Sequence, residues 1–409
     1  KNKKKKKKKK KKSIKMSQNL ILVDVTQDKD CIKHCHTENS ITWGGKPYTT
    51  EQYVEREKIL GEQDICSNPK LDENLEKYRK YLGIKYFAFK DLSLPDTGKC
   101  SQIVSALETL NRVAYIKKPN SDQEIPILSV CIGGVYTPQK FRGKRYASFM
   151  ISDLNKFYDD IASKYPEDSF LKYTTIFLYS EVGGFYEKFE YASRHVPIHY
   201  LENDSKLLNY IESLKENRKN VVPLVLEDIN NDLVSCLKAE EEECEKASKN
   251  PQISNKYKFY IKPDVDIYRW FKARDKYTAS IISSKLISEK PLIDGFKVED
   301  SKSHIIWHHS WNEDKLYVLN WYLENDSTDD AVTLLIKAFE EMGIYKIKKL
   351  AVWDEDLSGK TLKSIFENLE EHDSVHIGNE NSSLSAIRVK WLDNINELVW
   401  TNNGKASWF

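Results

Sequence analysis

The sequence contains no apolar run approaching the roughly 20 residues that a membrane span requires. No apolar segment of the signal-peptide type precedes its first apolar run, NLILVDV, so we expect no secretory signal. The patterns GxxxxGKS or GxxxxGKT and GxGxxG, which are typical of P-loop and dinucleotide-binding proteins, do not occur. These absences predict a cytoplasmic protein without a membrane partner and exclude both phosphate-binding fingerprints.

Cysteines are few and scattered. There are seven, an odd number, which is typical of free thiols in a reducing compartment. Cys31, His34, Cys35 and His36 lie close together, as metal ligands do. No second pair with zinc-like spacing follows, however, and the stretch resembles an amphipathic helix. We therefore expect no metal site.

Acidic residues are missing from residues 1–15, KNKKKKKKKKKKSIK, which include 12 lysines. Self-repulsion predicts a disordered tail, and a poly-lysine run before Met16 is more typical of translated leader sequence than of a nucleic-acid-binding arm. Removing these 12 lysines from 64 basic residues leaves 52 against 62 acidic ones, a formal net charge of −10. An acidic body argues against a nucleic-acid partner and suits a cationic substrate.

The remaining composition, 40% hydrophobic with nine Trp, is sufficient for two or three domains. Apolar patterning predicts strands and helices in mixed order, and hence an α+β fold with a mixed twisted sheet flanked by helices. Strands are expected at 20–25, 86–92, 100–117, 126–137, 172–180 and 195–201, and helices at 27–38, 49–60, 142–163 and 181–193.

The composition changes after the strand at 195–201. We expect a first domain at 16–201, a charged helical linker at 202–255, and a smaller α/β domain at 256–409 that covers the substrate side. The last segment repeats strand, helix and strand at a spacing like that of 126–180. An internal duplication is therefore plausible, although the second copy lacks a charged loop and is expected to bind no cofactor of its own.

The segment VYTPQKFRGKRYASFM places Arg142, Lys144 and Arg145 where a strand turns into a helix. The amides of a helix N-terminus favour anions, and Gly143 allows a ligand to approach the backbone closely. The turn predicts a site for a phosphate or pyrophosphate. The alternative is a solvated charged turn without a ligand.

RGKRYA following VYTP resembles motif A of the GCN5-related N-acetyltransferases (GNAT), with Arg/Gln-x-x-Gly-x-Gly/Ala. Arg142 and Ala147 match, whereas Arg145 replaces the usual first glycine. The resemblance implies acetyl-CoA as cofactor, with its pantetheine arm along one strand and its pyrophosphate at the turn. The implied contacts are Val135, Tyr136 and Thr137 for the arm, and Arg142, Gly143, Lys144, Arg145, Tyr146, Ala147 and Ser148 for the pyrophosphate.

LYSEVGGFYEKFEY, at 178–191, resembles motif B of the same family, with Glu190 in place of a common glycine. The resemblance puts Tyr186 at the position of the frequent proton donor, where a phenol protonates the departing coenzyme A. The alternative is that Tyr186 is a buried core residue. Together with WGGKPYTTEQYVERE at 43–57, these motifs resemble the fungal lysine N6-acetyltransferases of lysine catabolism over about 16–201.

This narrower resemblance implies an acyltransferase that acetylates the side-chain amine of free L-lysine by direct transfer. A protein or histone N-acetyltransferase is the first alternative. A tandem GNAT-like binding protein without activity is the second, since Arg145 and Glu190 both replace glycines. The family resemblance does not give the oligomeric state.

Direct transfer requires a neutral amine, and therefore a base. The sequence does not identify the base: Glu108 and Glu181 are the candidates, either could instead be a surface or capping carboxylate, and a chain of water molecules could serve in their place. Trp43 and Tyr48 are candidates for the walls of the substrate pocket. His308 and His309 are adjacent, so they lie on opposite faces of a strand, and we expect a structural role for both.

Overall fold

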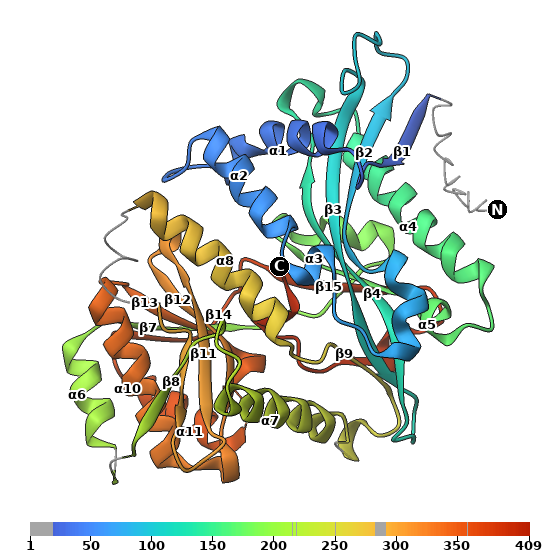
Figure 1. Ribbon diagram of the computed structural model, residues 1–409. Coiled ribbons are helices and arrows are strands. Elements are labelled where there is room, and N and C mark those ends of the chain that lie inside the picture. The colour runs from blue at the N-terminus through green and yellow to red at the C-terminus, as the bar shows by residue number, and fades with distance from the viewer. Residues whose placement is uncertain (1–18, 215, 218, 250, 283–291, 358) are drawn as a thin grey trace, which may run out of the picture.

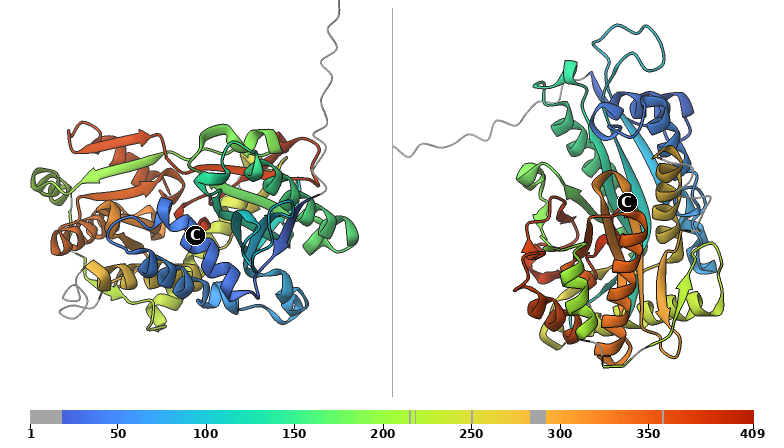
Figure 2. Two further views of the ribbon diagram at one scale, coloured as in Figure 1. Left: turned by 90° about the horizontal axis from the view of Figure 1, so that it is seen from above. Right: turned by 90° about the vertical axis from the view of Figure 1, so that its left-hand side faces the viewer.

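The computed structural model describes residues 19–214, 216–217, 219–249, 251–282, 292–357 and 359–409. The tail expected at 1–15 lies outside these ranges. Within them the strands form two twisted mixed sheets, one of nine and one of seven strands. Helices flank both sheets (Figures 1 and 2). The expected α+β class with a second domain is confirmed.

The first sheet has the order β1-β2-β3-β4-β5-β15-β6, and β4 and β5 are its parallel pair. Strands β9 and β16 extend it beside the far end of β3. The strands are β1 (Leu20–Asp24), β2 (Gly83–Asp91), β3 (Ile103–Lys117), β4 (Glu124–Tyr136), β5 (Thr175–Ser180), β6 (Ala192–Ser193), β9 (Tyr257–Tyr260), β15 (Leu384–Val389) and β16 (Leu398–Trp400).

This sheet and the helices along residues 29–189 make up the first lobe. A capping box of Thr49 and Gln52 begins α2, as the sequence predicts. The α4 helix packs its buried face, including Met150 and Leu154, against the sheet. The helices are α1 (Lys29–Trp43), α2 (Thr50–Gly61), α3 (Asp64–Ser67), η1 (Glu73–Tyr81), η2 (Gln139–Phe141), α4 (Tyr146–Lys164), α5 (Ser169–Lys172) and η3 (Gly183–Phe189).

The second sheet has the order β8-β10-β11-β12-β13-β7-β14, and β12 and β13 are its parallel pair. The strands are β7 (Ile198–Glu202), β8 (Val221–Leu224), β10 (Gly295–Val298), β11 (His304–Ser310), β12 (Lys315–Tyr322), β13 (Lys349–Trp353) and β14 (Val375–Asn379). We call this sheet and its helices the second lobe.

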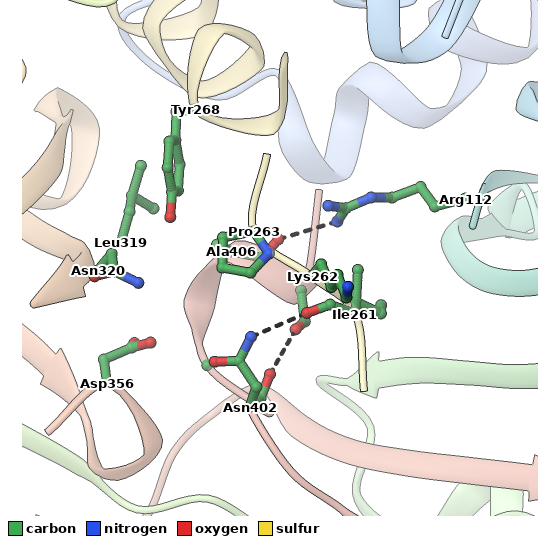
Figure 3. Close-up of a pocket in the computed structure, with 12 residues that line it drawn as sticks. Arg112, Ile261, Lys262, Pro263, Tyr268, Leu319, Asn320, Asp356, Asn402 and Ala406 are labelled. Atoms are coloured by element: carbon green, nitrogen blue, oxygen red, sulfur yellow. Dashed lines mark hydrogen bonds between the residues drawn. The ribbon is translucent and has the colours of Figure 1, made fainter. Parts of the chain in front are cut away.

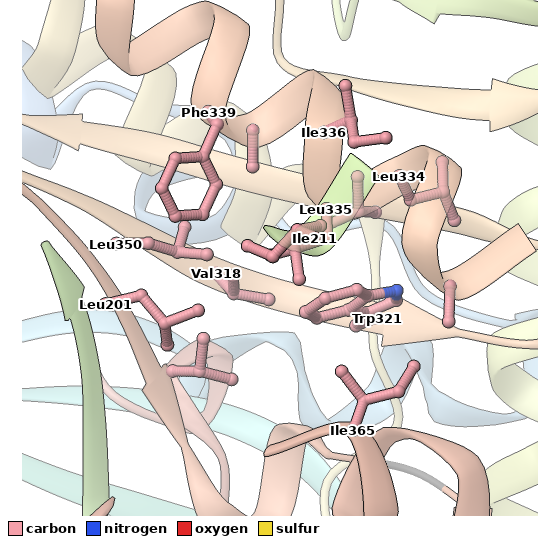
Figure 4. Close-up of a cluster of buried hydrophobic side chains, with 14 of the residues drawn as sticks. Leu201, Ile211, Val318, Trp321, Leu334, Leu335, Ile336, Phe339, Leu350 and Ile365 are labelled. Carbon is pink, nitrogen blue, oxygen red and sulfur yellow. The ribbon is translucent and has the colours of Figure 1, made fainter. Parts of the chain in front are cut away.

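The main helices of the second lobe are α6 (Ser205–Ser213), α7 (Asn231–Ser248), α8 (Val265–Ile282), α10 (Thr328–Tyr345) and α11 (Gly359–Leu369). Its short helices are η5 (Trp311–Glu313), η6 (Glu324–Asp326), η7 (Asp354–Asp356) and η9 (Lys405–Ser407), the last in contact with β12, whereas η4 (Pro251–Ile253) and η8 (Ile395–Glu397) lead into β9 and β16 of the first sheet. Figure 4 shows the lobe's core, where Trp321 and Val318 of β12 pack beneath Leu335 and Phe339 of α10.

The two sheets exchange one strand each. The strand expected at 195–201 does not close the first sheet, because β7 pairs with β13 and β14 in the second. In return, β15 lies between β5 and β6 in the first sheet. Strand pairs at corresponding positions are then parallel or antiparallel alike in the two sheets. In addition, α10 connects β12 to β13 as α4 connects β4 to β5. The fold is therefore an internal duplication.

The segment 202–255 is not a linker. It contains β8, which pairs with β10 at the edge of the second sheet, and helices α6 and α7. The expectation failed because VVPL is short, contains a proline and is flanked by charged stretches. A single boundary in the sequence also cannot separate sheets that share strands.

A pocket of only about 10 Å³ marks the seam between the lobes. Figure 3 shows Arg112 of β3 pointing at the final segment of the chain, where it donates to the carbonyl oxygen of Ala406 at 3.2 Å. Arg112 also pairs with Asp264 at 2.9 Å, and Asn402 donates to the carbonyl oxygen of Ile261 at 3.0 Å. These bonds hold the final segment between the two lobes.

Candidate functional site

A cavity of about 490 Å³ lies where two central strands of the first sheet part. Hydrogen bonding between β4 and β5 ends at the pair Ile132 and Leu178, while β4 continues to Tyr136. At this point Gly134 has a φ of +57°. The cavity walls come from α1, α2, β3, β4, β5 and η3 of the first lobe, and from α8, β11, β12, η5 and η9 of the second. The site is thus built by both halves of the chain.

Glu108 of β3 lines this cavity beside Gly134. Its Oε2 atom lies 3.5 Å from Nε2 of His36 on α1. Burial opposes the charged form of His36, but the hydrogen bond to Glu108 and its charge outweigh burial and raise the pKa of His36. The raised pKa favours the positive form of His36 next to the Glu108 carboxylate, and the contact holds that carboxylate in place.

Tyr186 of η3 lines the same cavity and is 7% exposed. Burial raises its pKa, and the negative charge of Glu181 adds to the effect, so the phenol keeps its proton at neutral pH. Glu181 also lines the cavity, but its side chain is exposed. Glu108 and Tyr186 thus meet at one cavity although 78 residues separate them in sequence.

Of the two aromatic residues expected to form walls of the substrate pocket, Trp43 and Tyr48, only Trp43 lines the cavity. Trp43, at the end of α1, lines it, and its ring meets that of Tyr136 edge to face at 6.1 Å. Tyr48 is buried outside the lining, where its hydroxyl shares a hydrogen bond with Thr278. It contributes indirectly, because its ring supports the guanidinium of Arg56, which does line the cavity.

The charged turn begins at the far end of β4. Val135 lines the cavity, whereas Tyr136 is buried under Trp43. The hydroxyl of Thr137 shares a hydrogen bond of 2.9 Å with Ser105. Arg142 folds back to donate to the carbonyl oxygen of Thr137 at 3.1 Å. The strand end and the turn are therefore joined by side chains.

Arg145 is the N-cap of α4 and has a φ of +67°, in the left-handed region. Glu190, which ends η3, has a φ of +72°. Both residues occupy positions where the GNAT motifs usually have glycine. The backbone therefore keeps a glycine-like conformation at both, at a cost of about 1–2 kcal/mol each.

The start of α4 is open to an anion. Within the described ranges no side chain caps the helix, and a Cβ atom added at Gly143, whose φ is +82°, would meet nothing within 4 Å. Arg142, Lys144 and Arg145 are exposed around it. Free helix amides together with positive side chains fit a pyrophosphate.

The first turn of α4 joins this surface to the core. Tyr146 is buried and donates a hydrogen bond of 2.6 Å to Asp91 of β2. Ala147 and Ser148 are half-buried next to it. Tyr146 thus fixes the helix start and faces away from solvent, while the neighbouring backbone stays near the surface.

Three residues of the second lobe line the cavity although the sequence did not mark them as functional: Arg274 of α8, His308 of β11 and Lys405 of η9. His308 and His309 lie on opposite faces of β11, as expected, yet both are buried because α8 covers one face and α10 the other. His309 bonds to Glu341 of α10 at 2.8 Å. The sequence offered only the cluster HHSW as a signal.

In the described ranges, no group of three His, Cys, Asp or Glu side chains is arranged to hold a metal ion. No helix in the described part of the chain is long and apolar enough to cross a membrane.

Residues 211–409 match the sequence family described as "LYC1 GNAT-like C-terminal domain". The match begins within α6, which agrees with the assignment of this segment to the second lobe.

The chain is 35% identical to an uncharacterized protein of Saccharomyces cerevisiae, over 95% of this chain and 98% of that protein. It is 24% identical to a protein of Yarrowia lipolytica named lysine acetyltransferase, over 93% of this chain and 97% of that protein. A crystal structure of an Enterococcus faecalis protein of unknown function, described as a probable N-acyltransferase, has a TM-score of 0.51. That protein is 11% identical, and the alignment covers 92% of this chain and 74% of that one, which shows a shared fold.

Proposed function

Because this chain belongs to the GNAT superfamily of acetyltransferases, we propose that it transfers an acetyl group from acetyl-CoA to the side-chain amine of free L-lysine. One observation carries the proposal. Glu108 and Tyr186 line one cavity at the point where β4 and β5 separate. A base and an acid at the same gap are what direct transfer to an amine requires. The Yarrowia relative named lysine acetyltransferase supports the choice of acceptor.

The donor would occupy the gap and the adjacent turn. Val135, Tyr136 and Thr137 offer backbone groups along the end of β4, and residues 142–148 offer amides and positive charge for the pyrophosphate. When bound, acetyl-CoA supplies the acetyl group as a thioester. The open start of α4 and the uncrowded Gly143 fit this assignment.

Glu108 would accept the proton that the acceptor must lose. A lysine side chain has a pKa near ~10.4, so the amine arrives mainly as ammonium and is not nucleophilic. The carboxylate of Glu108, held by His36 at 3.5 Å, provides the acceptor oxygen. Tyr186 holds its proton at Oη and would donate it to the departing sulfur. Trp43 would wall the alkyl stem of the acceptor.

An acceptor screen tests the proposal. Free thiol release from acetyl-CoA is measured with L-lysine, polyamines, aminoglycosides and histone-tail peptides at equal concentration. We expect L-lysine to give the highest kcat/KM. Turnover of peptides without turnover of L-lysine would instead support a protein acetyltransferase, and absence of acetyl-CoA binding at millimolar concentration would support a non-catalytic binding protein.

Replacing Tyr186 tests its role separately. Tyr186→Phe keeps the ring but removes the proton, so we expect kcat to fall about 10-fold to 100-fold while the acetyl-CoA Kd stays within about twofold. The Kd is measured by calorimetry on the same preparation. Weaker acetyl-CoA binding with an unchanged kcat would assign Tyr186 to cofactor binding instead.

A further inference from the structure

Two basic side chains of the second lobe line the cavity that Glu108 lines from the first lobe. Arg274 lies on α8 and Lys405 on η9, and both line the cavity. Lys405 is only 6% exposed, and its ammonium lies 3.9 Å from the ring centre of Trp408. Burial lowers the pKa of Lys405 to about 7, and the positive charge of Arg274 adds to this effect. The two cations are therefore close enough to repel each other.

Neither cation has a neutralising partner in the part of the chain that the structure describes. No carboxylate oxygen lies within 4.0 Å of the charged nitrogens of Arg274 or Lys405. Arg56, which lines the same cavity, pairs directly with Glu57. Two acids act on Lys405 through their charge: Glu313 is bonded to Lys315 at 2.8 Å and Tyr317 at 3.0 Å, and Asp356 accepts from the backbone amide of Lys405 at 3.1 Å. Arg274 is half-buried and Lys405 is buried, so an anion bound between them would pair both side chains and favour the protonated form of Lys405, and the cavity is the open side from which such an anion can come.

His308 adds a hydrogen-bond acceptor to the same wall. It is 3% exposed and stacks between Phe271 at 4.6 Å and Tyr317 at 5.3 Å. Its Nδ1 lies 3.3 Å from Oδ1 of Asp275. A carboxylate only accepts, so the proton sits on Nδ1 and the lone pair on Nε2.

The Nε2 atom of His308 is buried and has no hydrogen-bond partner in the described ranges. Burial lowers the pKa of His308, and Lys405 and Arg274 contribute to that, so the ring is neutral and Nε2 remains an acceptor. A buried acceptor without a donor is costly, which indicates that a ligand supplies the donor. An ammonium group supplies such donors.

Resting on the proposed acetyl transfer, we infer that the second lobe binds the α-carboxylate of a free amino acid between Arg274 and Lys405, with its α-ammonium at Nε2 of His308. The side chain of the amino acid then extends towards Glu108 and Tyr186 on the first lobe. A lysine within a peptide has no free α-carboxylate and would leave both cations unpaired. The substrate class is therefore free basic amino acids, and the second lobe sets this specificity.

The test compares acceptors that differ by one group. Thiol release by the full chain is measured with L-lysine, L-lysinamide, which lacks the carboxylate, and Nα-acetyl-L-lysine, which lacks the α-ammonium. We expect kcat/KM to fall about 100-fold for L-lysinamide and about 10-fold for Nα-acetyl-L-lysine. Cadaverine, which lacks the carboxylate but keeps a primary amine, is expected to behave like L-lysinamide.

The variant Arg274→Gln identifies the residue. It should lower kcat/KM for L-lysine about 30-fold to 100-fold, yet change that for L-lysinamide less than about threefold, because the amide has no charge to lose. Arg269→Gln is the matched control, since Arg269 lies on the same helix outside the cavity lining. It should leave both values within about twofold. Calorimetric binding of L-lysine and L-lysinamide gives the same comparison without turnover.

The outcomes separate the two proposals. The carboxylate site is overturned if kcat/KM is equal for L-lysine, L-lysinamide and cadaverine. It is also overturned if Arg274→Gln lowers kcat/KM equally for L-lysine and L-lysinamide. Neither result contradicts the proposed acetyl transfer. Absence of thiol release with every amine overturns the proposed function. In that case preferential binding of L-lysine over L-lysinamide still supports the carboxylate site, and equal binding overturns it.

Discussion

The turns after β4 and β12 occupy the same place in sheets of the same strand order, yet they carry opposite charge. The first has Arg142, Lys144 and Arg145, whereas the second has Glu324 and Asp326. The helix that follows also begins differently. No side chain caps α4, but Ser327 caps α10 by accepting from the amide of Asp330 at 3.3 Å.

The acidic turn of the second lobe is bonded within the protein itself. Asp326 accepts hydrogen bonds from the amides of Lys360 and Thr361 at the start of α11. Glu324 accepts from the amide of Lys302 at 3.0 Å. The same fold therefore has one turn open to an anion and one turn closed by its own side chains. Function lies in these local differences, since the topology is common to both lobes.

Glu108→Gln should give the largest effect. If the first lobe alone supplies the base, loss of this carboxylate should lower kcat about 100-fold or more without unfolding the protein. Glu181→Gln is the control at the same cavity, and it should keep more than about half the activity, because its exposed side chain is free to point to solvent. Similar losses in both variants, measured by thiol release, would argue against a specific role for Glu108.

The charge difference between the turns predicts one acetyl-CoA per chain. Calorimetry should give a stoichiometry of one, and Lys144→Gln combined with Arg145→Gln should weaken binding about 10-fold to 100-fold. The affinity of the unmodified chain should also fall with added salt more steeply than that of the double variant. A second binding site, or an unchanged Kd, would contradict the contrast between the turns.

The two exchanged strands are held by ion pairs of different burial. On β15, Arg388 is 5% exposed and bonds to Asp159 at 2.8 and 2.7 Å. On β7, Glu202 pairs with Lys349 at 3.0 Å in an exposed position. Arg388→Met should lower the free energy of unfolding by about 2 kcal/mol, and Lys349→Met by less than about 0.5 kcal/mol. Urea unfolding measures the free energy of unfolding of both variants. Equal decreases would show that the burial of the ion pair makes no difference.

The smallest effect concerns left-handed residues. Lys346 ends α10 with a φ of +57°, and Arg145 begins α4 with a φ of +67°. Glycine removes about 1–2 kcal/mol of strain but costs about 0.5–1 kcal/mol in chain entropy, so each change to glycine should stabilise by about 0.5 kcal/mol. Only Arg145→Gly should also weaken acetyl-CoA binding. Destabilisation by Lys346→Gly in thermal melts would show that the side chain matters more than the backbone.

The sequence predicted the elements well where the local pattern is strong. TIFLYS of β5 is apolar and wholly buried, and the helical periodicity of α4 is regular, so both were expected close to their observed bounds. The sequence pattern does not indicate that the two sheets exchange strands. The pattern of HVPIHYL does not distinguish between the two sheets, and only tertiary packing assigns β7 to the second, between β13 and β14.

The candidate site was partly predictable. Motif positions led to Tyr186 and Val135, and the need for a base led to Glu108. The structure brings all three to one cavity, while their roles stay predictions. Tyr48 lies outside the cavity lining, and its position within WGGKPY does not reveal which way the loop turns. Arg274 and Lys405 were not predicted because such side chains are usually exposed, whereas contacts between distant parts of the chain leave Arg274 half-buried and Lys405 buried at the cavity.

The reciprocal exchange of β7 and β15 has a consequence for synthesis. A ribosome adds about 200 residues between the end of β5 and the start of β15, which takes about 10–40 s at usual elongation rates. Throughout this interval the edge of β5 that later pairs with β15 is unpaired. During most of it β7 has been synthesised, but its partners β13 and β14 have not. The nascent polypeptide therefore depends on its last 26 residues, 384–409, to complete the first sheet. A ribosome that stalls before residue 384 releases a product with an unpaired strand edge, which is prone to aggregate.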